Sequence, residues 1–195
     1  MKISEETRSI LKNFATINSG IKVGAGNQLQ TISNMKNILA TANVPETFSQ
    51  EFSIYNLVEF LGAVSLLDNP DFNFNDNSLS ISDTDTSMTY FYASEGMVTS
   101  PDKMITMPDA EIKIDLSSTL LNELQKAASV LGVNDLQLVS DGTNIKLVVT
   151  DKKNATSNTF SRIVGEGNGV SFTMNFKIEN LKILDGNYEV FVSSK

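Results

Sequence analysis

The chain opens with a stretch in which apolar residues recur every three or four positions, the spacing of a helix that buries one face. The residues of this stripe are Ile10, Leu11, Phe14 and Ile17. Ser4 precedes them as a suitable N-cap, and Glu5 and Glu6 suit the first turn of a helix. The pattern therefore predicts a helix over residues 4–17.

Short segments that alternate between apolar and polar residues follow this helix, and turn-forming stretches at residues 24–26 and 44–46 separate them. They are typical of strands, which we place at residues 20–23, 29–33, 38–42 and 47–53. An apolar stripe of Leu57, Leu61 and Val64 predicts a second helix over residues 54–67, ended by the Asp-Asn-Pro sequence at residues 68–70. Three more strands are expected at residues 72–74, 79–82 and 87–92, and the turn at residues 75–77 makes a hairpin of the first two.

The same order of elements begins again in the second half. A strand is predicted over residues 111–115 and a helix over residues 117–131, where Gly132 ends it. Strands are expected at residues 135–139, 145–150, 158–164 and 170–176. A short helical turn over residues 178–184 and a final strand over residues 188–192 complete the pattern.

A six-residue pattern occurs at the same place in both halves. Phe52–Leu57 and Phe176–Leu181 both read F-x-I-x-N-L, which indicates an internal duplication. We therefore expect an α+β fold of two similar domains, each with helices packed on one face of antiparallel sheet. The least periodic stretch, residues 93–109, is interpreted as the linker between domains at residues 1–92 and 110–195.

The composition of the 195 residues narrows the possible functions. The absence of cysteine and histidine excludes disulfides, thiolate nucleophiles, cysteine zinc sites and imidazole-based catalytic triads. The formal net charge is −8, although a net charge does not describe any one face. The arginines are Arg8 and Arg162, too few to read bases in a groove, so sequence-specific DNA binding is not expected. No apolar run is long enough to span a bilayer, and no membrane partner is expected.

Basic residues lie on or beside the predicted helices. They are Lys2, Arg8, Lys12, Lys126, Lys177 and Lys182. The outward sides of helices in two such domains could form one surface with cations and few acids beside them. One interpretation is an ordinary solvated helix surface. The other is a sparse surface for phosphates, sequence-independent and sensitive to salt.

The predicted linker is unusually apolar. Its apolar residues are Met97, Val98, Met104, Ile105 and Met107, followed by Pro108. One interpretation is that these side chains fix the linker to the core. The other is that they border a pocket for partner peptides, because methionine adapts to several partners.

Three stretches together resemble the DNA polymerase sliding clamp of T-even-type tailed phages, which is similar in fold to the PCNA family. They are KNFATINSGI at residues 12–21, IYNLVEFLG at residues 54–62 and GNY at residues 186–188. The resemblance implies a homotrimeric ring that encircles double-stranded DNA without sequence preference and tethers the replicative polymerase. It also implies a clamp loader, other replication or transcription partners, and a site of action in the cytoplasm of the infected host cell.

Carried onto this chain, the resemblance places Lys2, Arg8, Lys12, Lys126, Lys177 and Lys182 toward DNA. It places Met97 to Pro108 beside the partner pocket. No catalytic residue, cofactor or metal is expected, since a tether makes and breaks no bond. The family also has another strand pair after the final strand predicted here, so the chain is expected to lack that pair.

Two other classes of function remain open from the sequence. A phage tail or baseplate protein could use the same duplicated β-rich fold with no DNA-tethering role. An enzyme based on lysine or carboxylate side chains is a third possibility, which the composition disfavours.

Overall fold

The computed structural model describes residues 1–101 and 106–194, which divide into two compact units. Unit 1 comprises Met1–Met104 and unit 2 comprises Ile105–Lys195. The division lies inside the stretch that the sequence marks as a linker, residues 93–109. Within the described ranges, no helix has both the length and the apolarity that crossing a bilayer would require.

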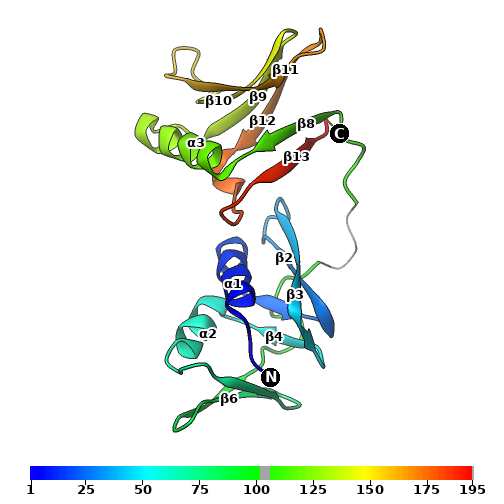
Figure 1. The fold of residues 1–195 in the computed structure, drawn as a ribbon, viewed down its shortest axis with the longest axis vertical. Helices are drawn as coiled ribbons and strands as arrows, with labels where there is room; N and C mark the ends of the chain where they lie inside the picture. The colour runs from blue at the N-terminus through cyan, green and yellow to red at the C-terminus, as the bar shows by residue number, and fades with distance from the viewer. Residues whose placement is uncertain (102–105, 195) are drawn as a thin grey trace. The chain divides into compact units, whose positions relative to one another are not determined.

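Unit 1 combines two helices with short antiparallel sheets (Figure 1). Its elements are α1 (Glu5–Ile17), β1 (Ile21–Val23), β2 (Gly26–Ile32), β3 (Leu39–Phe48), β4 (Phe52–Ile54), α2 (Leu57–Val64), β5 (Asp71–Phe74), β6 (Ser78–Ser82) and β7 (Ser87–Phe91). β1 pairs with β4, β2 pairs with β3, and β5, β6 and β7 form a three-stranded sheet in that order.

Helix α1 begins where the sequence predicts, because two side chains satisfy its first amide groups. The Thr7 N–H donates to the Ser4 hydroxyl at 3.2 Å. Glu46, from β3, accepts from the Ser4 N–H and from the Thr7 hydroxyl. A cap from a distant strand fixes the helix start to the sheet as well as to its own turn.

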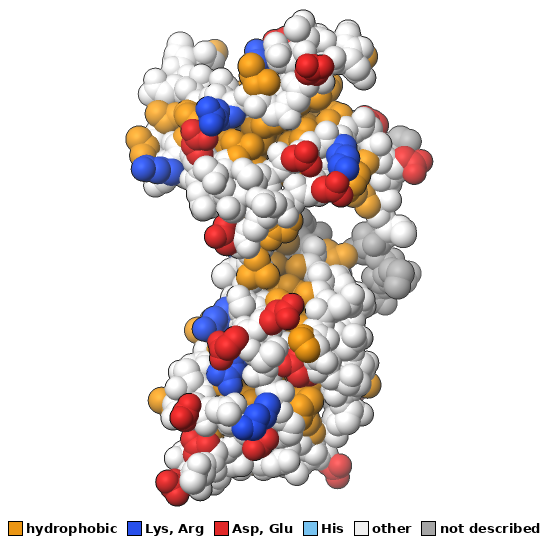
Figure 2. All heavy atoms as spheres, viewed as in Figure 1, with side chains coloured by type: hydrophobic (Ala, Val, Ile, Leu, Met, Phe, Trp, Pro, Cys, Tyr) orange, Lys and Arg blue, Asp and Glu red, His pale blue; other side chains and the backbone are white. Residues whose placement is uncertain are grey.

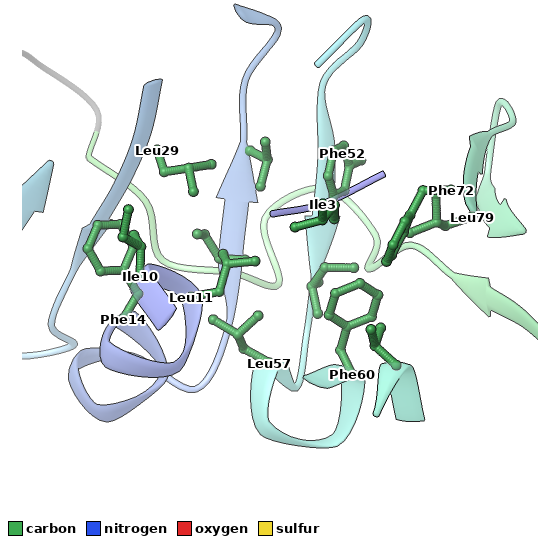
Figure 3. Packing of buried hydrophobic residues seen from close by; sticks show 14 of the residues in the cluster. Ile3, Ile10, Leu11, Phe14, Leu29, Phe52, Leu57, Phe60, Phe72 and Leu79 are labelled. Carbon is green, nitrogen blue, oxygen red and sulfur yellow. The ribbon is translucent and has the colours of Figure 1, made fainter. Parts of the chain in front are cut away.

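The core of unit 1 lies between the helices and the strands (Figure 3). Ile10, Leu11 and Phe14 of α1 and Leu57 and Phe60 of α2 are buried in it. From the strands come the remaining residues labelled there, Leu29, Phe52, Phe72 and Leu79, with Ile3 from the segment ahead of α1. Both helices thus present their apolar stripes to one continuous cluster.

Unit 2 combines one long helix, one short helical turn and two antiparallel sheets. Its elements are β8 (Ile112–Leu116), α3 (Ser118–Leu131), β9 (Asp135–Asp141), β10 (Asn144–Thr150), β11 (Phe160–Glu166), β12 (Ser171–Lys177), the 3-10 turn η1 (Ile178–Asn180) and β13 (Tyr188–Val192). The larger sheet has the order β11-β10-β9-β12, and β13 pairs with β8.

The two units repeat one plan, as the sequence predicts. In each, a long helix is followed by four strands, of which the first pairs with the fourth: β1 with β4, and β9 with β12. The F-x-I-x-N-L motif spans the end of that fourth strand and the start of the second helix or turn in both units. In both units, the residues ahead of the long helix pair with the strand that follows the second helix or turn. In unit 1, the backbones of Met1 and Phe72 of β5 are hydrogen-bonded to each other. In unit 2, β8 pairs with β13.

Several sequence predictions are wrong in detail. The strand predicted over residues 47–53 is instead the end of β3, a break at residues 49–51 and the start of β4. Residues 44–46 are not a turn but lie within β3. Proline has no N–H to donate to a neighbouring strand, and Pro45 is tolerated there because β3 forms a bulge opposite Asn27. The helix predicted over residues 54–67 starts only at Leu57, because Phe52–Ile54 pairs with β1 and Asn56 caps the helix. The helical turn of residues 178–184 ends at Asn180.

Candidate DNA-facing cations and partner-binding segment

Lys12 and Lys126 lie on the outer sides of the two long helices. Both side chains are exposed, opposite the buried stripes of α1 and α3. Neither forms an ion pair within the part of the chain that the structure describes. An exposed, unpaired ammonium group at the end of a flexible side chain can approach a phosphate without breaking an existing interaction.

Arg8 is held close to the protein. Its guanidinium Nη1 lies 3.0 Å from the Glu5 carboxylate, and only 20% of its side chain is exposed. It lines a hollow together with Lys2, Pro45 and Glu46, beside the capped start of α1. Lys2 itself is exposed. Arg8 would therefore have to leave Glu5 before it could make a close contact with DNA.

Lys177 pairs with a buried carboxylate. Its Nζ lies 2.6 Å from the Asp135 Oδ1, and the Lys152 N–H donates to the other carboxylate oxygen at 3.0 Å. The hydrogen bond from Lys177 lowers the pKa of Asp135, and the same contact raises the pKa of Lys177. Because removing Lys177 would leave a buried charge uncompensated, its clearest role is structural. Lys182, just beyond η1, is half-buried.

Acidic residues lie beside the candidate cations, so the expectation of few neighbouring acids is wrong at several places. Glu5 and Glu6 share α1 with Arg8 and Lys12. On α3, Glu123 pairs with Arg162 of β11 at 3.1 Å. Figure 2 likewise shows Lys and Arg side chains interspersed with Asp and Glu on the visible face of each unit. The described helices therefore present isolated cations rather than a continuous basic field.

The first part of the predicted linker packs against unit 1. The Ala93 N–H donates to the Ser53 carbonyl at 2.8 Å, and the Asn18 side-chain amide donates to the Thr99 carbonyl at 3.0 Å. Val98 lies over Gly20, where an added Cβ would come within 3.1 Å of the valine side chain and 2.9 Å of the Ile54 carbonyl oxygen. A glycine is needed at this close approach. These contacts could not be predicted from the sequence, because nothing in the local pattern around Asn18 and Gly20 indicates which distant residues they contact.

A cleft of about 810 Å³ opens beside this segment within unit 1. Val98 lines it, together with Lys22 of β1, Glu51 and Tyr92. Lys22 and Glu51, which both line it, form an ion pair of 2.9 Å. The cleft is more polar than the apolar pocket that the linker methionines led us to expect, and its lining comes from several elements with no shared motif.

The other residues predicted to bind partners are distributed differently. Met97 is exposed, as are Met107 and Pro108. Met104 and Ile105 lie outside the described residues. Val98 is thus the one member of this set, among those described, that lines the cleft.

The chain has the fold of PCNA and of the bacterial β clamp. PCNA from Entamoeba histolytica superimposes with a TM-score of 0.64 and 15% identity, covering 95% of this chain and 84% of that one. The Helicobacter pylori β clamp bound to a DNA ligase peptide gives 0.60 at 16% identity, covering 99% of this chain and 62% of that one. No family model matches the chain.

Sequence relatives then identify the family. The sliding clamp of Vibrio phage KVP40 is 34% identical over 199 residues, which span 98% of this chain and 90% of that protein. The sliding clamp of Enterobacteria phage T4 is 29% identical and covers 100% of this chain and 88% of that protein. The chain belongs to the sliding-clamp family of T4-like phages. These relatives support the clamp interpretation and give no support to a tail or baseplate role.

Proposed function

We propose that three copies of this chain close into a ring around duplex DNA and tether the replicative polymerase to its template. The observation on which this proposal depends is the likeness to the phage KVP40 sliding clamp, which runs through both units of the chain. The internal duplication supports the proposal as well. Because each copy contributes two similar domains, a few copies are enough to build a ring of similar units.

Weak contacts with DNA suffice for such a tether. A closed ring cannot leave circular DNA, so it needs no strong binding and remains able to slide. Lys12 and Lys126 are the best candidates for transient phosphate contacts, since each is exposed and unpaired among the described residues. The acidic balance of the whole chain, −8, disfavours strong non-specific attraction of DNA to the protein surface as a whole.

The partners of the ring are part of the same proposal. The H. pylori β clamp is found with a DNA ligase peptide, which supports peptide docking as the means by which this chain takes polymerase and other replication proteins. A clamp loader would open the ring, and the protein would act in the cytoplasm of the infected host cell. The chain would act without catalysis, consistent with a sequence that contains no histidine or cysteine.

Sedimentation over a range of protein concentrations tests the assembly. A trimer has a mass of about 64 kDa, three times the 21.3 kDa of the chain. We expect that species to dominate at high concentration. A monomer at every concentration would contradict the ring.

Polymerase stimulation on primed circular DNA tests the two lysines. With Lys12→Glu and Lys126→Glu together, we expect shorter products and the mass of the unmodified protein. The affinity for DNA falls as the salt concentration rises. Removing one lysine–phosphate interaction should make the slope of log affinity against log salt concentration less steep by about 0.9. Lys153→Glu, in the exposed turn between β10 and β11, is the matched control and should leave product length unchanged. An equal effect in the control would assign the change to net charge alone.

A further inference from the structure

One buried asparagine joins three parts of unit 1. Asn18 is the C-cap of α1 and is only 5% exposed. Its side-chain amide nitrogen donates to the Ile32 carbonyl at 2.9 Å and to the Thr99 carbonyl at 3.0 Å. Its side-chain oxygen accepts from the Gly20 N–H at 3.1 Å. Both N–H groups of the amide are therefore used, and they connect the end of β2 to the segment of residues 93–101.

The connection from Asn18 to Thr99 has a special place in that segment. Among the described residues, it is the one hydrogen bond that joins residues 94–101 to the rest of the unit. The Met97 N–H donates within the segment, to the Ser94 carbonyl. Loss of the Asn18 amide should therefore release this segment.

The connection to Ile32 leads into the turn between β2 and β3. Ser33 follows Ile32, and its hydroxyl accepts from the N–H groups of Asn37 and Ile38, at 3.2 and 3.1 Å. The turn holds Lys36 at a backbone φ of 56°, a conformation that lysine rarely adopts. The position of this lysine thus depends on how the turn is anchored.

The groups that Asn18 connects lead to three sides of the cleft of about 810 Å³. Thr99 lines it directly, Lys36 reaches it from the turn after β2, and Lys22 reaches it from β1. Asn18 is buried behind these walls and is absent from the described lining. It can therefore affect a molecule in the cleft only through the positions of the walls.

A peptide is the kind of molecule that this cleft fits. Tyr92 and Val98 contribute apolar surface, whereas Lys22, Glu51 and Asp76 contribute charges of both signs. Sites for small molecules are mostly apolar, with few polar groups. A mixed lining better matches an extended peptide, which carries a polar backbone and side chains of both kinds.

We propose that Asn18 is a positioning residue for partner docking. Its amide holds the β2–β3 turn and residues 98–100 at a fixed separation, and a partner peptide binds the cleft in this arrangement. A site that is arranged in advance binds more tightly, because binding does not have to order it. The inference rests on the proposed function, in which partner proteins dock on this chain as peptides.

The first test is release of the segment in the full-length protein. Asn18→Asp keeps the size of the side chain and an acceptor for the Gly20 N–H, but it replaces the two donated hydrogens with an oxygen that repels both carbonyls. Protease cleavage within residues 93–101 should become faster by about tenfold or more, the equivalent of one lost hydrogen bond. Hydrogen exchange should rise in the same residues and stay unchanged in α2 and in unit 2.

The second test is partner docking, measured as DNA synthesis on primed circular DNA with the clamp loader and increasing concentrations of the replicative polymerase. With Asn18→Asp, the polymerase concentration for half-maximal synthesis should rise by about tenfold. Synthesis at saturating polymerase should not change, and neither should retention of the variant on nicked circular DNA. A generally damaged protein would instead fail in all three measurements.

Two further variants make the test specific. Ser19→Asp adds the same charge at an exposed position next to Asn18 and should behave like the unmodified protein in every measurement. Asn18→Ser removes the two amide donors without placing a charge in the interior, so it keeps the test valid if Asn18→Asp unfolds. It should release the same segment and shift half-saturation in the same direction.

Three results would overturn the inference. The first is a segment of residues 93–101 that stays as protected in both Asn18 variants as in the unmodified protein. The second is a released segment with unchanged half-saturation, which would leave Asn18 a structural residue only. The third is an equal effect of Ser19→Asp. Failure of the unmodified protein to stay on circular DNA would instead contradict the proposed function, and protease cleavage would still show whether Asn18 holds the segment.

Discussion

The two units share one order of elements but differ in how many apolar side chains they bury. Among the described residues, the main core cluster contains 19 buried apolar residues in unit 1 and 11 in unit 2, so the second unit derives less stability from burial. Part of the difference comes from α2, which buries Leu57, Phe60 and Val64, and part from β6, which buries Leu79 and Ile81. The same F-x-I-x-N-L motif can therefore be a core element in one copy and a surface in the other.

The largest expected effect on stability comes from the phenylalanine at the first position of the motif in each unit. Phe52→Ala should lower the free energy of unfolding of unit 1 by about 3–5 kcal/mol, because it empties a site enclosed by aromatic rings. Phe176→Ala should lower that of unit 2 by less than about 1 kcal/mol, because its side chain is partly in water already. Urea unfolding, with hydrogen exchange to assign each transition to a unit, measures both. Equal destabilisation of the two units would mean that Phe176 is covered in solution.

The next effect distinguishes the two kinds of lysine. Lys177→Met should destabilise unit 2 clearly more than Lys126→Met does, since the buried Asp135 carboxylate loses its ion-pair partner. Lys126→Met, at an exposed position of the same unit, should change stability by less than about 0.5 kcal/mol. Thermal unfolding of the two variants gives the comparison. A neutral Lys177→Met would show that the ion pair does not hold β12 to β9.

Two glycines in unit 1 provide a matched pair. Gly20→Ala should cost about 1–3 kcal/mol, because the new Cβ meets the Ile54 carbonyl and Val98. Gly62→Ala, on α2 with open space around it, should stabilise by about 0.5–1 kcal/mol through helix propensity. Urea midpoints and the proteolysis rate of residues 93–101 test both changes. The prediction fails if Gly20→Ala leaves that segment as protected as in the unmodified protein.

The smallest effect concerns how each long helix is capped from outside. Glu46 accepts from the Ser4 N–H in unit 1, whereas in unit 2 the neutral Asn187 side chain accepts from the Ser118 N–H at 3.3 Å. Although burial opposes it, hydrogen bonding to Ser4 and Thr7 lowers the pKa of Glu46 below its usual value of 4.5. The stabilisation is therefore present above about pH 4.5 and is lost as the pH falls through the lowered pKa.

Glu46→Gln should accordingly cost about 1 kcal/mol near neutral pH and much less in acid. The matched change, Asn187→Ala, should show no such dependence on pH in this range. Unfolding in urea at a series of pH values from 7 to about 3 measures both. A destabilisation by Glu46→Gln that is the same at every pH would contradict the role of the ionised carboxylate.

The sequence predicts the regular elements of this fold better than their connections. The stripe from Ile10 to Ile17 and the strand at residues 188–192 match the structure closely, because a strong period fixes both type and extent. The predicted second helix extends back to Ile54 because the F-x-I-x-N-L motif continues directly into helical spacing. The pairing of Phe52–Ile54 with β1 is a long-range interaction that no local pattern encodes.

The candidate site is predicted less completely, for a similar reason. Lys12 and Lys126 are exposed as expected, because each lies opposite an apolar stripe on its own helix. The partner of Lys177 could not be found from sequence, since Asp135 is 42 residues away and the two meet only because β12 pairs with β9. The exposure of Phe176 could not be predicted either, because the motif has the same pattern in both units.

The most direct test of the central claim is a comparison of protein retention on circular and linear DNA. The protein would be loaded on nicked circular DNA by its clamp loader, separated from free protein by gel filtration, and followed after a restriction enzyme cuts the circle once. A ring should remain on the circle and leave the linear molecule through its ends. Equal retention on circular and linear DNA would contradict a topological link and indicate ordinary binding to the duplex.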